Sequence, residues 1–505
     1  MQAFKKKIGG ALLGALLIAA GLLLVPPLLE KKTETHVTEF LQKIPGGVRA
    51  QSVKADFWNK EVVLQGIAGT GKRLDGGEFT FQAEEIRIRD IKTGSPAASG
   101  PTRLFGLLRV RGLKIRSDIA VPGFEARPIT QTITVGDLSL RDVVGDLNRL
   151  LQTYGAGREE FSDALASFRA GNVDMEGYAV SSDVAGAGSV LSTLDSVTGR
   201  DMSLLSSGPF EARGFKLNAL GMDIALIGKM RAASASAPNV YRHAVVMYPP
   251  HDPRDGLRGL MRALETAPAV LRGMECEDIA LPPDFSTGKR IHIAGTSVDL
   301  TLDTHSAELR VTLSGLTLPP EIYRTILFAA GFAQTYDKDL RLDAVLDVNG
   351  ALEGKSGKLT VNRISLADTA LASLESAGAF TFTVGGREGP EALFTSGADL
   401  FLKNFRVVIE DYALTDVLLA AFGNSPAMRA TAVERLRKAA DAADGKFPAK
   451  LLRGLAQLVA APGRLSVAVN PAAPLPLPLP DSPDDMSETE LRALNSGTSV
   501  EYTPR

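Results

Sequence analysis

The sequence has few of the residues on which most enzyme and metal sites depend. Among its 505 residues are one cysteine, one tryptophan and five histidines: His36, His243, His251, His292 and His305. Cys276 has no second cysteine with which to form an intrachain disulfide or a Cys-x-x-Cys motif, and we expect it to be a small apolar core residue. No HExxH zinc motif or GxSxG nucleophile elbow is present. We therefore expect no catalytic residues, no metal site and no cofactor.

Neither sign of charge dominates the chain. Lys and Arg total 56 and Asp and Glu total 58, which gives a formal net charge of −2. Such a balance produces no field that would attract a polyanion, and aromatic residues make up only 6% of the chain. Nucleic acid is therefore excluded as an expected partner.

One stretch resembles a phosphate-binding loop. Gly66 to Arg73 reads GIAGTGKR, but Arg73 stands where such a loop needs Ser or Thr for magnesium. Strand-like alternation flanks the stretch on both sides, where a phosphate-binding loop would lead into a helix. We interpret it as a glycine-rich connection between two antiparallel strands.

The longest apolar run lies near the N-terminus. Residues 8–29 are uncharged and, as a helix, would span about 33 Å, enough to cross a bilayer. The run is longer than the apolar part of a cleaved signal peptide and no small-x-small site ends it. We expect an uncleaved membrane anchor with the N-terminus in the cytoplasm and the body in the periplasm. Its expected lipid-facing residues are Ile8, Leu12, Leu16, Ile18, Leu22, Leu24 and Leu29, flanked by Lys5, Lys6, Lys7, Lys31 and Lys32.

A short motif recurs along the body. It consists of a polar residue or glycine followed by apolar, any and apolar residues, as in Arg111 to Ile115, Glu176 to Val180 and Ser314 to Leu318. Each copy puts two apolar side chains on one face of a strand. Longer alternating stretches, such as 296–313 and 340–364, predict antiparallel meanders with one buried face.

Helical periodicity interrupts the strands. A juxtamembrane helix is expected over 33–42, and further helices over 140–154, 159–169, 252–271, 320–336, 414–422, 427–443 and 449–459. At the start of the helix expected over 252–271, the residues His251, Asp252 and Asp255 could form a metal site. Capping of the helix by Asp252, with Pro253 at its first position, is the simpler interpretation.

These patterns predict an α+β protein: an N-terminal transmembrane helix, then a predominantly antiparallel, curved β-sheet body with inserted and C-terminal helices. The expected divisions are residues 1–30 as cytoplasmic stub and anchor, 31–185 as a β-rich domain with a helical insertion, and 186–470 as a β-meander domain with helices. Residues 471–505 are expected to form a Pro-rich, disordered tail. Its Pro-Leu repeat either lies along an apolar surface or binds a partner.

The anchor, the juxtamembrane helix and the stretch from Val48 to Ile67 resemble the start of AsmA-like envelope proteins, a group that includes TamB. The recurring strand motif also resembles them. The resemblance implies an anchored periplasmic β-rich body connected with outer-membrane lipid or protein homeostasis, and it carries no catalytic residues.

Three hypotheses on function follow. The first is a non-enzymatic protein whose one-sided sheet binds lipid or an envelope protein. The second is a structural adaptor that uses the C-terminal helices and the Pro-Leu tail. The third is an envelope hydrolase with widely scattered catalytic residues. The sequence does not determine the oligomeric state.

Overall fold

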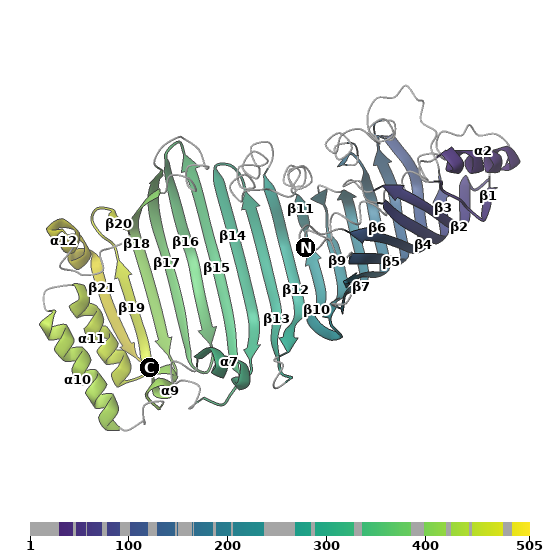
Figure 1. Ribbon diagram of the computed structural model, residues 1–505. Helices are drawn as coiled ribbons and strands as arrows, with labels where there is room; N and C mark the ends of the chain where they lie inside the picture. Colours follow the sequence, from purple (N-terminus) through teal and green to yellow (C-terminus); the bar gives the residue numbers. More distant parts are fainter. Residues whose placement is uncertain are drawn as a thin grey trace. The chain divides into compact units, whose positions relative to one another are not determined.

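A computed structural model of the chain describes most of the body. The described residues are 30–43, 47–56, 58–72, 78–90, 102–119, 129–146, 149, 164, 166–184, 188–203, 206–236, 268–283, 288–327, 336–384, 398–420, 426–443, 447–477 and 487–505. The protein is mostly antiparallel β-sheet, as predicted, with few helices (Figure 1).

The transmembrane part of the predicted fold class is corrected. None of the helices in the described ranges is both long enough and apolar enough to cross a bilayer. The first of them, α2 (Glu30–Lys43), has only 14 residues, and charged and polar side chains dominate it. The predicted anchor residues and Lys5 to Lys7 lie outside the described residues, while Lys31 and Lys32 belong to α2. The predictions of an α+β class with a membrane-spanning helix, and of the inner-membrane localisation that depended on that helix, are therefore wrong.

The chain divides into two compact units, Met1–Cys276 and Glu277–Arg505, here called unit 1 and unit 2. The division falls within strand β12 (Ala269–Pro283), whereas the sequence analysis placed one between residues 185 and 186.

Unit 1 is an antiparallel meander. Its strands are β1 (Ser52–Asp56), β2 (Glu61–Lys72), β3 (Glu78–Arg89), β4 (Thr102–Ile119), β5 (Ile129–Gly145), β6 (Arg169–Val184), β7 (Gly188–Ser203), β9 (Phe210–Ala219) and β10 (Met222–Ala232). Each of these pairs with the next along the chain. Two short strands, β8 (Ser206–Ser207) and β11 (Ser234–Ser236), pair with each other, and β11 also pairs with β12.

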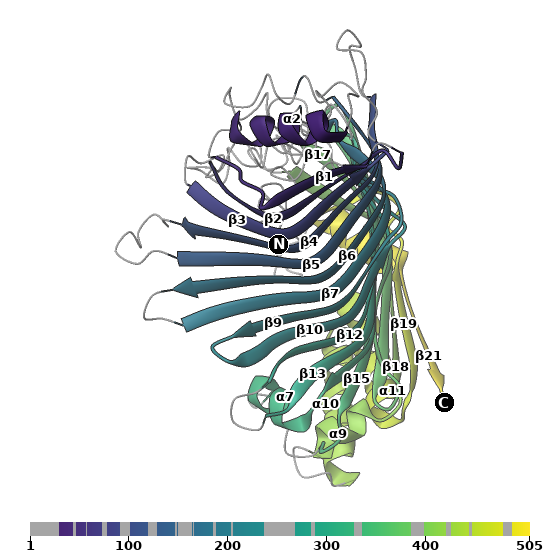
Figure 2. The ribbon, with the colours of Figure 1, turned by 90° about the vertical axis from the view of Figure 1, so that its right-hand side faces the viewer.

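One face of unit 1 is a packed core. Strand register places Leu64, Ile86, Val110, Leu138 and Met175 in one row across β2 to β6, and all five are buried. The strands bend along their length (Figure 2), and Val37 and Leu41 of α2 join the same cluster. Burial of this face supplies the main stabilisation of unit 1.

Unit 2 is a second meander. Its strands are β13 (Arg290–Leu302), β14 (Ser306–Leu318), β15 (Leu340–Glu353), β16 (Ser356–Asp368), β17 (Ala372–Val384), β18 (Ala398–Asp411), β19 (Gly463–Val469), β20 (Leu475–Leu477) and β21 (Thr498–Pro504). Strands β13 to β19 pair in chain order, β20 pairs with β18, and β21 pairs with β19. The helices are α7 (Pro320–Leu327), α9 (Leu414–Ala420), α10 (Pro426–Ala442), α11 (Phe447–Ala460) and α12 (Glu488–Gly497).

In five copies of the recurring motif the second residue has left-handed φ: Gly112, Gly177, Gly214, Asp278 and Gly315. These residues lie on alternate strands of the meander. Strand register is unchanged across Gly112, Gly177 and Gly214, whereas at Gly315 it shifts by one residue against β15, as in a β-bulge. A left-handed residue within a strand interrupts the alternation of faces, which is why Val110 and Leu113, on either side of Gly112, are both buried.

The same spacing explains an incorrect helix prediction. Residues 140–154 were expected to be helical, yet β5 continues through Gly145, with Asp142 in the left-handed region. Leu140 and Val143 are three apart and both buried because the left-handed residue Asp142 between them interrupts the alternation of faces. Residues 237–267, which include His251, Asp252 and Asp255, and most of 159–169 lie outside the described residues. The end of the helix predicted over 252–271 is strand instead, since β12 begins at Ala269. The helices predicted over 33–42, 414–422, 427–443 and 449–459 correspond to α2, α9, α10 and α11, and α7 occupies the start of 320–336.

The glycine-rich stretch is strand, not a connection. Gly66 to Lys72 belongs to β2 and pairs with β3 as far as Lys72 opposite Glu78. The rings of Phe81 and Phe79 lie over Gly69 and Gly71, where an added Cβ would come within 2.8 and 2.4 Å of them. The glycines therefore make room for aromatic rings, and the segment has no phosphate-binding geometry.

The prediction of a disordered C-terminal tail over residues 471–505 is also wrong, because a helix and a strand lie within it. Helix α12 begins with a capping box, in which Ser487 Oγ accepts from Glu490 N at 3.3 Å and Ser487 N donates to Glu490 Oε2 at 2.8 Å. Strand β21 then pairs with β19 along its whole length. Leu475 is only 2% exposed and packs beside Leu402 and Leu494, so the Pro-Leu repeat, as far as Leu477, lies along an apolar surface of its own chain.

A Gly315→Ala variant tests the bulge at that residue. Gly315 has φ +61°, and an added Cβ would lie 2.9 Å from Cβ of Ala294. We expect the free energy of unfolding of unit 2 to fall by about 1–2 kcal/mol from backbone strain alone, measured by urea titration with circular dichroism. The control is Gly350→Ala on the neighbouring strand, where the nearest atom would be 3.7 Å away and no φ strain arises. Equal losses from both substitutions would contradict the assignment of a bulge at Gly315.

Candidate functional site

Strands β13 to β17 of unit 2 carry three apolar rows on one face. Cross-strand register defines each row. The rows are Thr296–Leu313–Ala344–Leu366–Leu374, Val298–Val311–Leu346–Ile364–Ser376 and Leu300–Leu309–Val348–Val361–Gly378. We call these residues the leucine face. None carries a charge, and only Thr296 and Ser376 have a side-chain hydroxyl.

The opposite face of the same strands carries charges of alternating sign. Asp299 lies opposite Arg310, Arg310 opposite Asp347, and Asp347 opposite Arg363. Arg363 then forms an ion pair with Glu375 at 3.4 Å. Such a ladder of opposite charges suits a face in contact with water. The two faces of this part of unit 2 therefore differ sharply in polarity.

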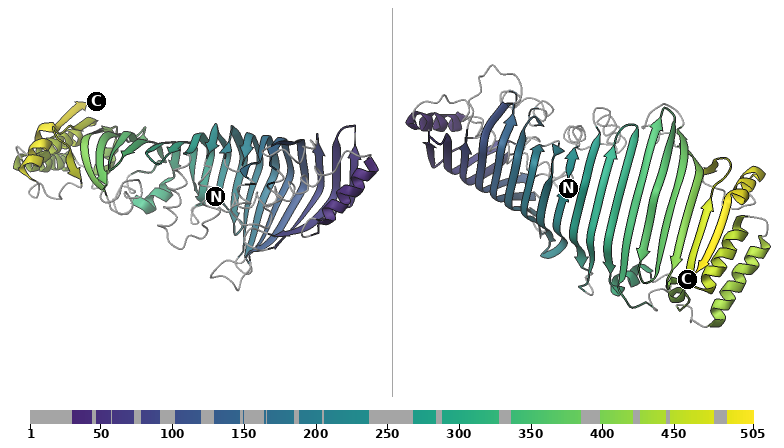
Figure 3. Two further views of the ribbon diagram at one scale, coloured as in Figure 1. Left: turned by 90° about the horizontal axis from the view of Figure 1, so that it is seen from above. Right: turned by 180° about the vertical axis from the view of Figure 1, so that it is seen from behind.

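The leucine face is not a closed core. All of its residues on β13 to β15 are only partly buried, and Ile364, Leu366 and Leu374 are 40%, 46% and 40% exposed. Leu108, on the packed face of unit 1, is 0% exposed. Seen from behind in Figure 3, these strands form a single layer. Within the described part of unit 2, no helix lies over the middle of the leucine face (Figure 1).

Helix α11 covers the same face where the sheet ends. The row that contains Leu374 continues through Ile409 on β18 to Leu465 on β19. There Gly454 of α11 faces Leu465 and Val500, and a Cβ at position 454 would lie 2.7 Å from each of them. At β19 the row is therefore covered by a helix. Within the described residues, no helix covers the same row at β13 to β17.

Small buried clusters border the leucine face. At one end of the strands Tyr323 donates through Oη to the carbonyl oxygens of Tyr336 (2.6 Å) and Lys338 (3.0 Å), beside Leu340 and Leu371. Burial raises the pKa of Tyr336, so its phenol stays neutral. At the other end Leu352 and Val384 form a second cluster. The face is thus bounded by packed side chains and open in the middle.

Those residues considered for chemistry that the structure describes do not come together, while His251, Asp252 and Asp255 lie outside the described ranges. His292 lies on β13 and His305 in the turn after it, where His305 Nδ1 is 2.7 Å from Thr304 Oγ1. Cys276 is half-buried rather than a core residue. Among the described residues no group of three His, Cys, Asp or Glu could hold a metal ion. The expectation of a non-enzymatic protein remains a prediction.

The sequence did not indicate which part of the sheet has an exposed apolar face. Alternation predicted a dry side for most of the body, but units 1 and 2 carry the same pattern. The signal that separates them is burial of that side, which depends on the curvature of each unit and on which elements pack over it. The leucine face carries no charged side chain and two hydroxyls, those of Thr296 and Ser376, and such a surface can bind an apolar partner without hydrogen bonds.

No family model, no curated protein and no solved structure matches the chain.

Proposed function

We propose that the protein is a non-enzymatic lipid-binding protein that holds acyl chains on the leucine face. The observation that carries the proposal is the set of three aliphatic rows left half-exposed on β13 to β17, with a charged ladder on the reverse side. Five strands about 4.8 Å apart make the face about 20 Å wide, and its three rows, which span five residues of β15, make it about 17 Å long. That area is about 300 Å², within the range of the largest apolar patch of a monomer, which is often a functional surface.

The composition of the face favours lipid over protein as the occupant. Protein interfaces concentrate their binding energy in Trp, Tyr and Arg, whereas Leu and Val are under-represented among such residues. The leucine face has none of the first group and consists mainly of the second. An acyl chain requires only a dry surface, because it has no polar group to satisfy.

The AsmA-like resemblance implies a role in outer-membrane lipid or protein homeostasis, and the first of these agrees with the proposal. The adaptor alternative has less support, since Leu475 of the Pro-Leu repeat is buried within unit 2. Helix α11 likewise uses its apolar side on β19 and β21.

Lipid extraction tests the proposal. The full chain is purified without added lipid, extracted with organic solvent, and the extract is analysed by mass spectrometry. We expect acyl lipids in at least equimolar amount to protein, and saturable binding of a fluorescent fatty acid once the protein has been stripped of lipid. A protein that yields no lipid and does not bind the fatty acid would contradict the proposal.

A further inference from the structure

The only tryptophan of the chain points into water. Trp58 lies in the turn between β1 and β2 and is 87% exposed. Tryptophan is normally among the more deeply buried side chains, because its large ring gains most from leaving water. An indole displayed in this way marks a contact surface more often than a packing residue.

The turn that presents Trp58 is held in place. Asp56 accepts hydrogen bonds from Asn59 N (3.0 Å) and Asn59 Nδ2 (2.7 Å), and Asp90 N donates to the carbonyl oxygen of Lys60 at 3.0 Å. The bond from the backbone N–H of Asn59 is the main reason why the pKa of Asp56 lies below its usual value. The carboxylate therefore stays charged at neutral pH, and the ring is presented without a further cost of ordering the turn.

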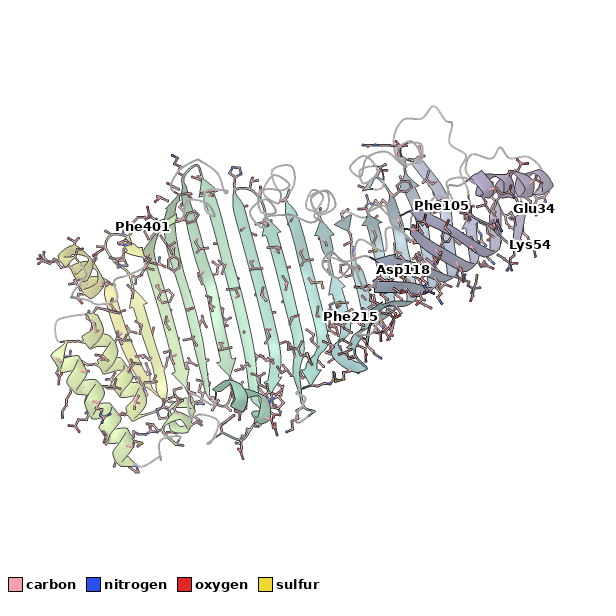
Figure 4. All side chains as sticks on the ribbon, in the orientation of Figure 1. Glu34, Lys54, Phe105, Asp118, Phe215 and Phe401 are labelled. Atoms are coloured by element: carbon pink, nitrogen blue, oxygen red, sulfur yellow. The ribbon has the colours of Figure 1, made fainter. Side chains whose placement is uncertain are left out.

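Exposed lysines lie in and next to the turn. Lys60 belongs to the turn itself and Lys54 to β1, which leads into it, while the nearby acid Glu61 is paired with Arg89 at 3.0 Å and Arg87 at 3.7 Å. In Figure 4, Lys54 lies at the end of unit 1 that also holds Glu34 of α2, whose Oε1 accepts from Ala55 N at 3.2 Å. An exposed amphipathic ring with lysines nearby in the chain favours the headgroup region of an anionic bilayer.

We propose that the Trp58 turn docks unit 1 on an anionic lipid surface. The surroundings favour lipid over a protein partner, because a tryptophan that anchors a protein interface lies at the centre of an apolar patch. The described neighbours of Trp58 in the turn, Asn59 and Lys60, are polar and exposed. The proposal uses none of the residues of the leucine face, so the two sites can be tested separately.

Intrinsic fluorescence tests the docking directly, since Trp58 is the only tryptophan. Vesicles of phosphatidylglycerol and phosphatidylcholine are expected to shift its emission to the blue, and brominated acyl chains in those vesicles are expected to quench it. Vesicles of phosphatidylcholine alone are expected to act more weakly. Emission that stays that of a water-exposed indole at saturating anionic vesicles would overturn the proposal.

Two variants separate docking from acyl-chain binding. Trp58→Ala is expected to lower co-sedimentation with anionic vesicles roughly tenfold and to leave binding of a fluorescent fatty acid unchanged. Leu220→Ala is the matched control, because Leu220 is 66% exposed in the β9–β10 turn at the opposite ends of the strands, and it should co-sediment like wild type. Leu366→Asp should retain the blue shift. Normal co-sedimentation of Trp58→Ala, or loss of the blue shift in Leu366→Asp, would overturn the docking assignment.

Discussion

A Leu366→Asp variant is expected to bind a fluorescent fatty acid at least about tenfold more weakly than wild type while remaining folded. Leu366 is on the row of the leucine face that also contains Leu313 and Leu374. With 46% of the side chain exposed, the new carboxylate stays hydrated in the free protein, so stability changes little. A bound acyl chain would cover that carboxylate, and removing an unpaired charge from water costs several kcal/mol.

Thr360→Asp is the control for this variant. Thr360 lies on the same strand, β16, but on the opposite face, between Asn349 and Ala379. It introduces the same charge into a face that already carries charges, so fatty-acid affinity should remain within about twofold of wild type. Equal affinities for the two variants would show that acyl chains do not lie on the leucine face.

Leu108→Ala is expected to lower the free energy of unfolding of unit 1 by about 2–5 kcal/mol. Leu108 is 0% exposed and lies between Ile88 and Leu140 in a fully paired part of the sheet. Truncation leaves a cavity in a face that cannot collapse, because backbone pairing on both sides holds the strands apart. Hydrogen exchange of peptides from β3 to β5, followed by mass spectrometry, measures the loss.

Leu366→Ala supplies the matched comparison for stability. The chemical change is identical, but Leu366 is half-exposed on unit 2, so we expect a loss below about 1 kcal/mol in peptides from β15 to β17. A loss as large as that of Leu108→Ala would mean that the leucine face is a closed core. That result would remove the physical basis for ligand binding there.

Much of the sheet could be predicted because strand alternation is local. The stretches 296–313 and 340–364 gave the correct apolar faces, which are now those of β13 to β16. The left-handed residues within strands could not be recognised, since each of them places apolar residues three apart on one face, as a helix does. Leu140 and Val143 are the clearest example, and the recurring motif showed its meaning only once Gly112, Gly177 and Gly315 were seen to have left-handed φ.

The errors at the ends of the chain have other causes. Proline and charge made 471–505 look disordered, but the capping box at Ser487 and the pairing of β21 with β19 give most of it structure. The transmembrane helix was predicted from the length of the uncharged run over residues 8–29. The helices in the described ranges do not include a membrane span. The exposure of Trp58 could not be predicted from the sequence, because it depends on the tertiary structure.

Photocrosslinking from the two faces of β16 is the most direct test of acyl-chain binding on the leucine face. A photoreactive amino acid is placed at position 366 in one variant and at position 365 in another, since Ser365 lies on the opposite face, between Val345 and Glu375. After loading with lipid and irradiation, mass spectrometry should detect lipid adducts at position 366 and very few at 365. Adducts of equal yield at both positions, or none at 366, would contradict the lipid-binding function.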